Sequence, residues 1–159
     1  MVSIRPATAD DAESVHAIAQ EAFAHYTSRI GRPAVPMSVD YAAAIGAGKV
    51  WVAGERRTDG FVLLENTDDS LLLDVIAVVP AAQGSGVGSA LLAFVDTEAR
   101  TRGYTRVTLY TNVKMTENLA YYPRHGYVET GRESVQGFER VFFAKDLGGS
   151  DDAGGFYSA

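Results

Sequence analysis

The sequence predicts an α/β fold in which helices flank one mixed sheet. Three observations support this. The run "LLLDVIAVV", from Leu71 to Val79, is too continuously apolar for an exposed strand and is typical of a central one. A helical pattern follows between Val87 and Ala99, and the strand-like run "TRVTLYT" comes next. Two strands joined through a helix form a β-α-β unit, so the sheet is expected to be parallel at that point.

The N-terminal elements follow from caps and periodicity. "SIRPAT" is a short strand ending at proline, and Thr8 with Asp11 forms a capping box for the next helix. "TSRIGRPAVPM" contains two prolines and a glycine and is expected to be a loop, after which Ser38 caps a short helix over "YAAAI". The apolar stripe of the first helix comprises Ala12, Val15, Ile18, Ala22, Phe23 and Tyr26.

The remaining elements complete the sheet. "KVWVAGERR" and "GFVLLEN" are two strands joined around "TDG", and the Asp59-Gly60 pair favours a hairpin. Gly103 is expected to stop the helix that begins at Val87. A short helix around "ENLAYYPRHG" precedes a last hairpin, "YVETGRE" and "FERVFFAKDL", joined through "SVQG". Residues 1–147 therefore form one domain, and the Gly-rich tail 148–159 is expected to be disordered.

Composition excludes several classes of function. The 159 residues include no cysteine, and the spacing of the three histidines would not hold a metal, so neither thiolate chemistry nor a metal site is expected. The N-terminus lacks a cationic region followed by an apolar core, and no run approaches the ~18 apolar residues of a membrane span. We therefore expect a soluble, cytoplasmic protein.

Charge argues against polyanionic partners. The net charge of -6 disfavours nucleic acid and membrane surfaces. Five basic residues and one acid lie between Arg100 and His125, so this segment carries +4 and the remainder -10. The basic segment would suit an anionic ligand and the remainder a cationic one, although cations at a helix end explain Arg100 and Arg102 equally well.

The glycine cluster "QGSGVG" lies between the strand that ends at Val79 and the helix that begins at Val87. A dinucleotide fingerprint fails because Ser89 occupies the sixth position and Thr108 replaces the later acid, and a P-loop fails because no lysine occurs between Lys49 and Lys114. Glycines here let several backbone N–H groups point at one anion, aided by the helix dipole. The alternative is a Gly-rich turn with close helix packing.

Two motifs in order resemble the GNAT superfamily of acetyl-CoA-dependent N-acetyltransferases. "VIAVVPAAQGSGVGSALL" matches an apolar strand ending Val-x-Pro, followed by Gln or Arg-x-x-Gly-x-Gly or Ala. "LYTNVKMTENLAYYPRHGY" matches a strand and short helix ending Tyr-x-x-x-Gly-Phe, with Tyr122 at the tyrosine and Tyr127 in place of Phe. The resemblance covers residues 3–147. It implies a mixed sheet of six to seven strands, splayed between strands 4 and 5, with about four helices.

The resemblance also implies roles for particular residues. The pantetheine arm of acetyl-CoA would pair with the backbone near Ile76, Ala77 and Val78, and the Val78 N–H would stabilise the oxyanion. Tyr122 would protonate the leaving thiolate and also contact the cofactor; alternatively, it is a half-buried aromatic beneath it. The pyrophosphate would lie on a cradle made of Gln83, Gly84, Ser85, Gly86, Val87, Gly88 and Ser89.

Two departures from the family pattern bear on these roles. Met115 stands where many members have an Asn that touches pantetheine, and Asn112 or Asn118 is a candidate to replace it. Pro123 follows Tyr122 directly and is expected to push Tyr122 away from helical angles.

The general base and the acceptor carry no motif. Asp74 is the only acid in the central strand, on the same face as Ile76 and Val78, and is either the base or a residue bonded to nearby backbone. Tyr26, Arg29 and Arg32 are candidates for binding the acceptor, a small-molecule or peptide primary amine.

We expect direct attack in a ternary complex, since no cysteine can carry the acyl group. The alternative is a catalytically silent acyl-CoA-binding sensor. A homodimer is left open.

Overall fold

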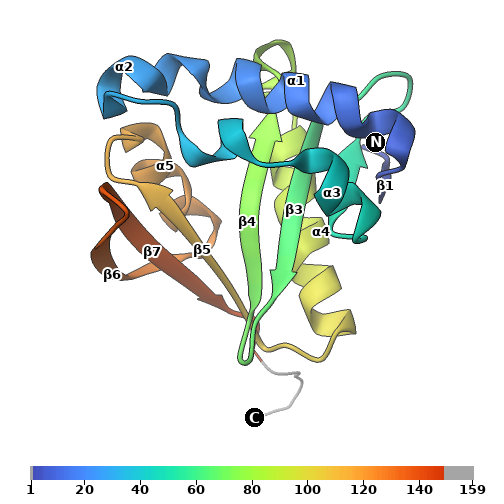
Figure 1. Cartoon of the computed structure of the whole chain (residues 1–159). Coiled ribbons are helices and arrows are strands. Elements are labelled where there is room, and N and C mark those ends of the chain that lie inside the picture. Colours follow the sequence, from blue (N-terminus) through green and yellow to red (C-terminus); the bar gives the residue numbers. More distant parts are fainter. Residues whose placement is uncertain (1, 149–159) are drawn as a thin grey trace. The chain divides into compact units, whose positions relative to one another are not determined.

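The computed structural model describes residues 2–148, which form two compact units (Figure 1). The first comprises residues 2–65 and 73–94, and the second comprises residues 66–72 and 95–148. The strands have the order β1-β2-β3-β4-β5-β7-β6, a mixed seven-stranded sheet in which β4 and β5 are parallel, as predicted. The tail predicted for residues 148–159 lies outside the described residues, except for Gly148.

The first unit is built around strands β1 to β4. β1 (Ile4–Pro6) pairs antiparallel with β2 (Val50–Ala53), and β2 pairs antiparallel with β3 (Gly60–Asn66). β4 (Leu71–Val78) follows. Helices α1 (Ala12–Phe23) and α3 (Tyr41–Gly46) lie over one face of β3 and β4, and the start of α4 (Val87–Thr101) lies on the opposite side (Figure 1).

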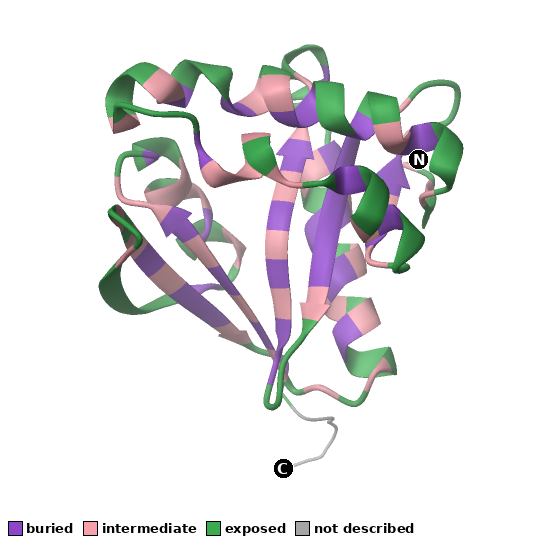
Figure 2. Ribbon diagram, in the orientation of Figure 1, coloured by how far each residue is buried: buried purple, intermediate pink, exposed green. Residues whose placement is uncertain are grey.

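The core of the first unit explains why these elements form. Val15, Ile18, Phe23 and Tyr26 of the predicted helical stripe are buried, and Phe61 through Leu64 are buried along β3. In β4, buried and half-buried residues alternate along the strand (Figure 2). The predicted central strand is therefore confirmed, one residue shorter than expected.

Two details between α1 and α3 differ from the sequence prediction. The segment predicted as loop contains a short helix, α2 (Thr27–Ile30), which ends at Gly31 with φ of 89°, and a 3-10 turn over Val35–Ser38. The cap of α3 is Asp40, whose carboxylate accepts from the Ala43 N–H at 3.0 Å, instead of Ser38. Ser38 is too early because it belongs to the 3-10 turn.

The second unit combines the end of α4 with the C-terminal elements. β7 (Phe138–Asp146) pairs antiparallel with both β5 (Arg106–Asn112) and β6 (Val128–Val135). The predicted last hairpin is confirmed, and its turn at Gln136 and Gly137 has φ of 52° and 83°, as expected of a two-residue hairpin turn. Gly103 has φ of 88° and lies two residues beyond α4, as predicted for its stop.

The short helix α5 (Thr116–Tyr121) continues as a 3-10 turn over Pro123–His125. Within residues 2–148, no helix is long and apolar enough to cross a membrane.

Candidate active site

The end of β4 presents one half-buried face. Asp74, Ile76 and Val78 are half-buried, whereas Val75 and Ala77 between them are 5% and 4% exposed. The alternation places Asp74 on the same face as Ile76 and Val78, as predicted. This face is accessible enough to meet a ligand, and the other belongs to the core.

Asp74 acts on a neighbour that the sequence did not indicate. Burial raises the pKa of the Tyr41 hydroxyl, and the negative charge of Asp74 raises it further. The Tyr41 hydroxyl donates to the carbonyl of Pro36, and its ring meets Phe61 edge-on at 5.2 Å. The Asp74 carboxylate thus lies near the first residue of α3. Sequence gave no signal for this pair because 33 positions separate the residues.

The predicted cradle has the backbone conformation that its glycines suggested. Gly84 and Gly86 have φ of 81° and 96°, a region that side chains rarely adopt. A Cβ built on either would meet no atom within 4 Å, so the backbone there faces open space. These glycines therefore serve the conformation of the loop and leave its surface clear, and close helix packing does not require them.

The amide groups of the cradle are largely unused. The Ser85 N–H donates to the Ala82 carbonyl at 3.2 Å, and the Ala90 N–H to that of Gly86 at 3.0 Å. The Gln83 N–H donates to the Pro80 carbonyl at 3.2 Å. Within residues 2–148, no backbone carbonyl accepts from the remaining five amides of the cradle. Those amides belong to Gly84, Gly86, Val87, Gly88 and Ser89.

The cradle is anchored at both ends. Ala82 and Val87 are 9% and 6% exposed, and a 3-10 turn at Pro80–Ala82 precedes the loop. The Ser85 hydroxyl donates to the Ala82 carbonyl, and the Gln83 side chain donates to the Val78 carbonyl at 3.3 Å. Gln83 is thus turned toward the strand end.

A diphosphate fits this loop. The donors are neutral backbone N–H groups at the start of a 15-residue helix, whose dipole favours an anion. None of the side chains from Gln83 to Ser89 carries a negative charge that would repel one. The loop can therefore hold the pyrophosphate of a nucleotide cofactor without a lysine.

The second unit holds Tyr122, at the junction of α5 and the 3-10 turn. The residue is 6% exposed, and its ring lies 5.5 Å from that of Tyr121, 5.7 Å from Tyr127 and 5.8 Å from Phe143. The ring is therefore buried in an aromatic cluster.

The prediction that Pro123 would displace Tyr122 from helical angles is wrong. Tyr122 has φ of -64° and ψ of -40°, inside the helical region. Its N–H donates to the Asn118 carbonyl at 3.1 Å, and its own carbonyl accepts from His125 at 2.9 Å. Pro123 begins the 3-10 turn, a position where the missing N–H costs nothing.

Asn118 lies one helical turn before Tyr122, and Met115 directly precedes α5. The Asn118 side chain donates to the Thr111 hydroxyl at 3.1 Å and approaches the Met115 sulfur at 3.6 Å. Met115 is 4% exposed. Asn118 thus ties α5 to β5.

Tyr127 stands where the family pattern has Phe. Burial raises the pKa of its hydroxyl, and the charge of Asp96 adds to the effect. Lys145 pairs with Asp96 at 2.7 Å and lies 5.7 Å from the centre of the Tyr127 ring. Among the described residues, the Tyr127 hydroxyl has no hydrogen-bond partner.

The three residues expected to bind the acceptor lie in and around α2: Tyr26 directly precedes it, Arg29 is within it and Arg32 follows it. Tyr26 is 6% exposed, with His25 stacked at 3.8 Å and the Arg29 guanidinium 5.2 Å from its ring. Arg29 and Arg32 are exposed. Tyr26 therefore supports Arg29, and the two arginines are the groups that an acceptor could reach.

Comparison with known proteins identifies relatives. A family model described as "Acetyltransferase (GNAT) domain" matches residues 46–129. Probable N-acetyltransferase 14 of Xenopus tropicalis is 33% identical over 109 residues, which are 65% of this chain and 53% of that protein. Mycothiol acetyltransferase of Jonesia denitrificans is 39% identical over 83 residues, 51% of this chain and 26% of that protein. The matches thus span about half or less of these relatives' length.

One solved structure illustrates the similarity of fold. PaiA N-acetyltransferase from Thermoplasma acidophilum, in complex with coenzyme A, aligns with a TM-score of 0.74. The alignment covers 92% of this chain and 99% of that one, at 15% identity. At that identity the similarity shows the fold alone.

Proposed function

Because the chain belongs to the GNAT acetyltransferase family, we propose that it transfers an acetyl group from acetyl-CoA to a primary amine. The observation that carries the proposal is the row of unused amides over Gly84 and 86–89, at the start of α4 and directly after β4. A loop with that many free donors and no charge suits the pyrophosphate of a coenzyme. The amine that accepts the acetyl group would belong to a small molecule or to a peptide.

Bound acetyl-CoA would supply an activated thioester. The cradle would hold its pyrophosphate, and the backbone of Ile76, Ala77 and Val78 would pair with the peptide-like arm. The Val78 N–H would donate to the carbonyl oxygen on which negative charge develops. Gln83 donates to the Val78 carbonyl and so ties the next peptide along the chain, between Val78 and Val79, to the cradle.

Tyr122 is the proposed general acid. A phenol with an ordinary pKa of about 10 can protonate a departing thiolate, whose conjugate acid has a somewhat lower pKa. The aromatic rings of Tyr121, Tyr127 and Phe143 pack around it. Asn118, one helical turn earlier, is proposed to contact the same ligand.

Asp74 is the proposed base, directly or through water. The carboxylate lies on the half-buried face of β4 that also carries Ile76 and Val78. A negative charge there would draw a cationic amine toward the reaction and accept its proton. Arg29 in α2 and Arg32 just after it would select among acceptors.

A screen of thiol release tests the proposal. Purified protein is incubated with acetyl-CoA and, in turn, amino acids, polyamines, aminoglycosides and peptides, while free CoA thiol is measured. We expect release that depends on one class of amine. Binding of acetyl-CoA without release in any arm would instead indicate the silent sensor.

A further inference from the structure

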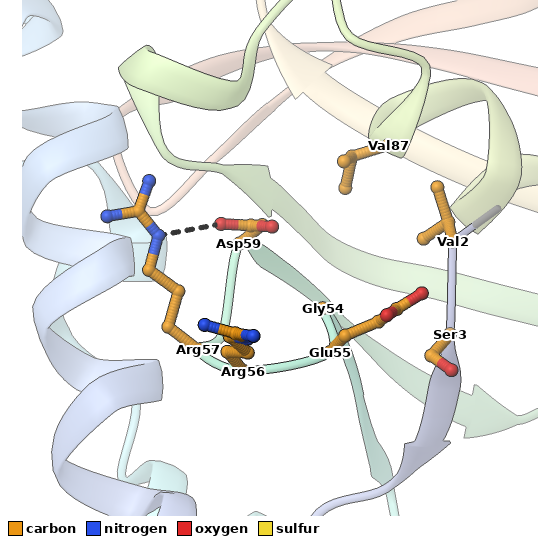
Figure 3. Close-up of a pocket in the computed structure, with 8 residues that line it drawn as sticks. All are labelled: Val2, Ser3, Gly54, Glu55, Arg56, Arg57, Asp59 and Val87. Atoms are coloured by element: carbon orange, nitrogen blue, oxygen red, sulfur yellow. Dashed lines mark hydrogen bonds and ion pairs between the residues drawn. The ribbon is translucent and has the colours of Figure 1, made fainter.

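We propose that a pocket beside the cradle binds the 3′-phosphate of coenzyme A through Arg56, an inference that rests on the proposed function. The pocket has a volume of about 480 Å³ and lies within the first unit (Figure 3). Its walls come from the two residues that precede β1, the loop between β2 and β3, and the first residue of α4. They comprise Val2, Ser3, Gly54, Glu55, Arg56, Arg57, Asp59 and Val87.

The loop that carries the arginines is fixed to the rest of the unit. The Asp59 N–H donates to the Ala53 carbonyl at 2.7 Å, and the Asp59 carbonyl accepts from the Val79 N–H at 2.8 Å. Gly54 has φ of 131°, and a Cβ there would lie 2.0 Å from the Arg57 carbonyl oxygen, so only glycine fits. Arg56 thus projects from a closed loop bonded to the residue that precedes Pro80.

One of the two arginines is available to a ligand. Arg57 pairs with the Asp59 carboxylate at 3.3 Å, as Figure 3 shows. Arg56 forms no ion pair or hydrogen bond within residues 2–148. A guanidinium offers several N–H donors in a geometry that suits phosphate oxygens. Glu55 lies on the same wall and would oppose an anion.

The chemistry of the cofactor selects the 3′-phosphate. Val87 lines the pocket and also contributes one of the free amides of the cradle, so the two sites adjoin. In coenzyme A the ribose 3′-phosphate is only a few covalent bonds from the pyrophosphate. None of the eight lining residues is aromatic, so the pocket offers no ring on which adenine could stack.

Calorimetric titration with CoA and with 3′-dephospho-CoA tests the inference. At about 0.05 M salt we expect the wild type to bind CoA about tenfold more tightly than the dephospho form. In Arg56→Gln the two affinities should agree within about twofold, because the loss falls on CoA alone. Arg56 is exposed, so the substitution leaves folding intact.

Two further variants control for charge. Glu55→Gln removes the carboxylate that opposes an anion, so it should increase the preference for CoA over 3′-dephospho-CoA. Arg132→Gln removes one positive charge, as Arg56→Gln does, but from β6, and it should leave the preference unchanged.

Three results would overturn the inference. If the wild type bound CoA and 3′-dephospho-CoA equally, the pocket would not bind the 3′-phosphate, although the cradle could still bind the pyrophosphate. If Arg56→Gln retained the full preference for CoA, the same conclusion would follow. If neither ligand bound the wild type, the proposed function would fail as well.

Discussion

At the residue scale, the role proposed for Tyr122 depends on a single oxygen atom. Tyr122→Phe keeps the ring among its three aromatic neighbours and removes only the proton donor. Because general acid catalysis is typically worth about 10² to 10⁴ in rate, kcat should fall by that order. The affinity for acetyl-CoA should change less than about tenfold. Steady-state kinetics and calorimetry measure the two quantities.

Tyr121→Phe is the matched control, since it removes a hydroxyl from the adjacent half-buried ring. Its kcat should stay near that of the wild type. If Tyr122→Phe also kept a near-normal kcat, water or another group would protonate the thiolate.

Gly86 tests the cradle. Gly86→Asp places a carboxylate against the proposed pyrophosphate and should abolish the thermal stabilisation that acetyl-CoA gives by mass action. Gly86→Asn imposes a similar side chain at the same φ of 96° without the charge, and Asn tolerates such angles better than most residues. It should retain part of the shift.

Gly48→Asp controls for acidic substitution at a positive φ, here 75°, with the same open space around it. A folded Gly86→Asp protein with an unchanged acetyl-CoA shift would show that the cradle does not bind the cofactor.

At the scale of elements, Asp11 joins β1 to α1. Its carboxylate accepts from the Arg5 guanidinium at 2.8 and 2.9 Å and from the Thr8 N–H at 2.7 Å. The Arg5 hydrogen bonds, more than any other contact, lower the pKa of Asp11 to about 2. The folded-state pKa lies below the unfolded value of about 3.9. The stabilisation is therefore present above about pH 4 and lost as the pH falls toward 2.

Asp11→Asn should accordingly lower the free energy of unfolding by about 1 to 2 kcal/mol at pH 7, allowing for the half-exposed Arg5. Urea titrations between pH 7 and pH 2 should show the difference from wild type shrinking below pH 4. Asp10→Asn, at an exposed neighbour, should have no such effect. A difference that did not vary with pH would mean that packing, and not charge, is lost.

Local patterns predicted most elements. Thr8 with Asp11 forms the predicted capping box, Gly103 has the left-handed angle expected of a helix stop, and the last hairpin forms where it was predicted. Contacts between residues that are far apart in the sequence could not be predicted from local patterns. The free Arg56, the Asp74-Tyr41 proximity and the bond from Asn118 to Thr111 depend on where the chain folds back. Ser38 was mistaken for a cap because Ser and Asp are equally good ones.

At the scale of the whole molecule, charge is unevenly distributed along the chain. Outside the segment from Arg100 to His125 the charge is -10, which should draw cationic acceptors by electrostatic attraction. We expect kcat/KM for the best acceptor to fall as salt rises from about 0.05 to 0.3 M, because the field is screened. If kcat/KM did not change with salt, electrostatic attraction of the acceptor would be ruled out.

The sequence indicated the family but not the acceptor. The two family motifs lie at the proposed cofactor loop and at Tyr122, and neither reaches the region expected to bind the acceptor. Acceptor choice would depend on residues such as Arg29 and Arg32, near a left-handed Gly31, for which no motif exists. No motif marks the general base either, so Asp74 is proposed for that role from its position on β4 alone.

The central claim is direct transfer from acetyl-CoA to an amine, and the destination of the acetyl group tests it. After turnover with the best acceptor and isotope-labelled acetyl-CoA, mass spectrometry follows the label in the acceptor and in the protein. We expect the label on the acceptor amine in an amount equal to the CoA released, and none on the protein. Label held on a protein side chain, or CoA released without acetylated acceptor, would contradict direct transfer.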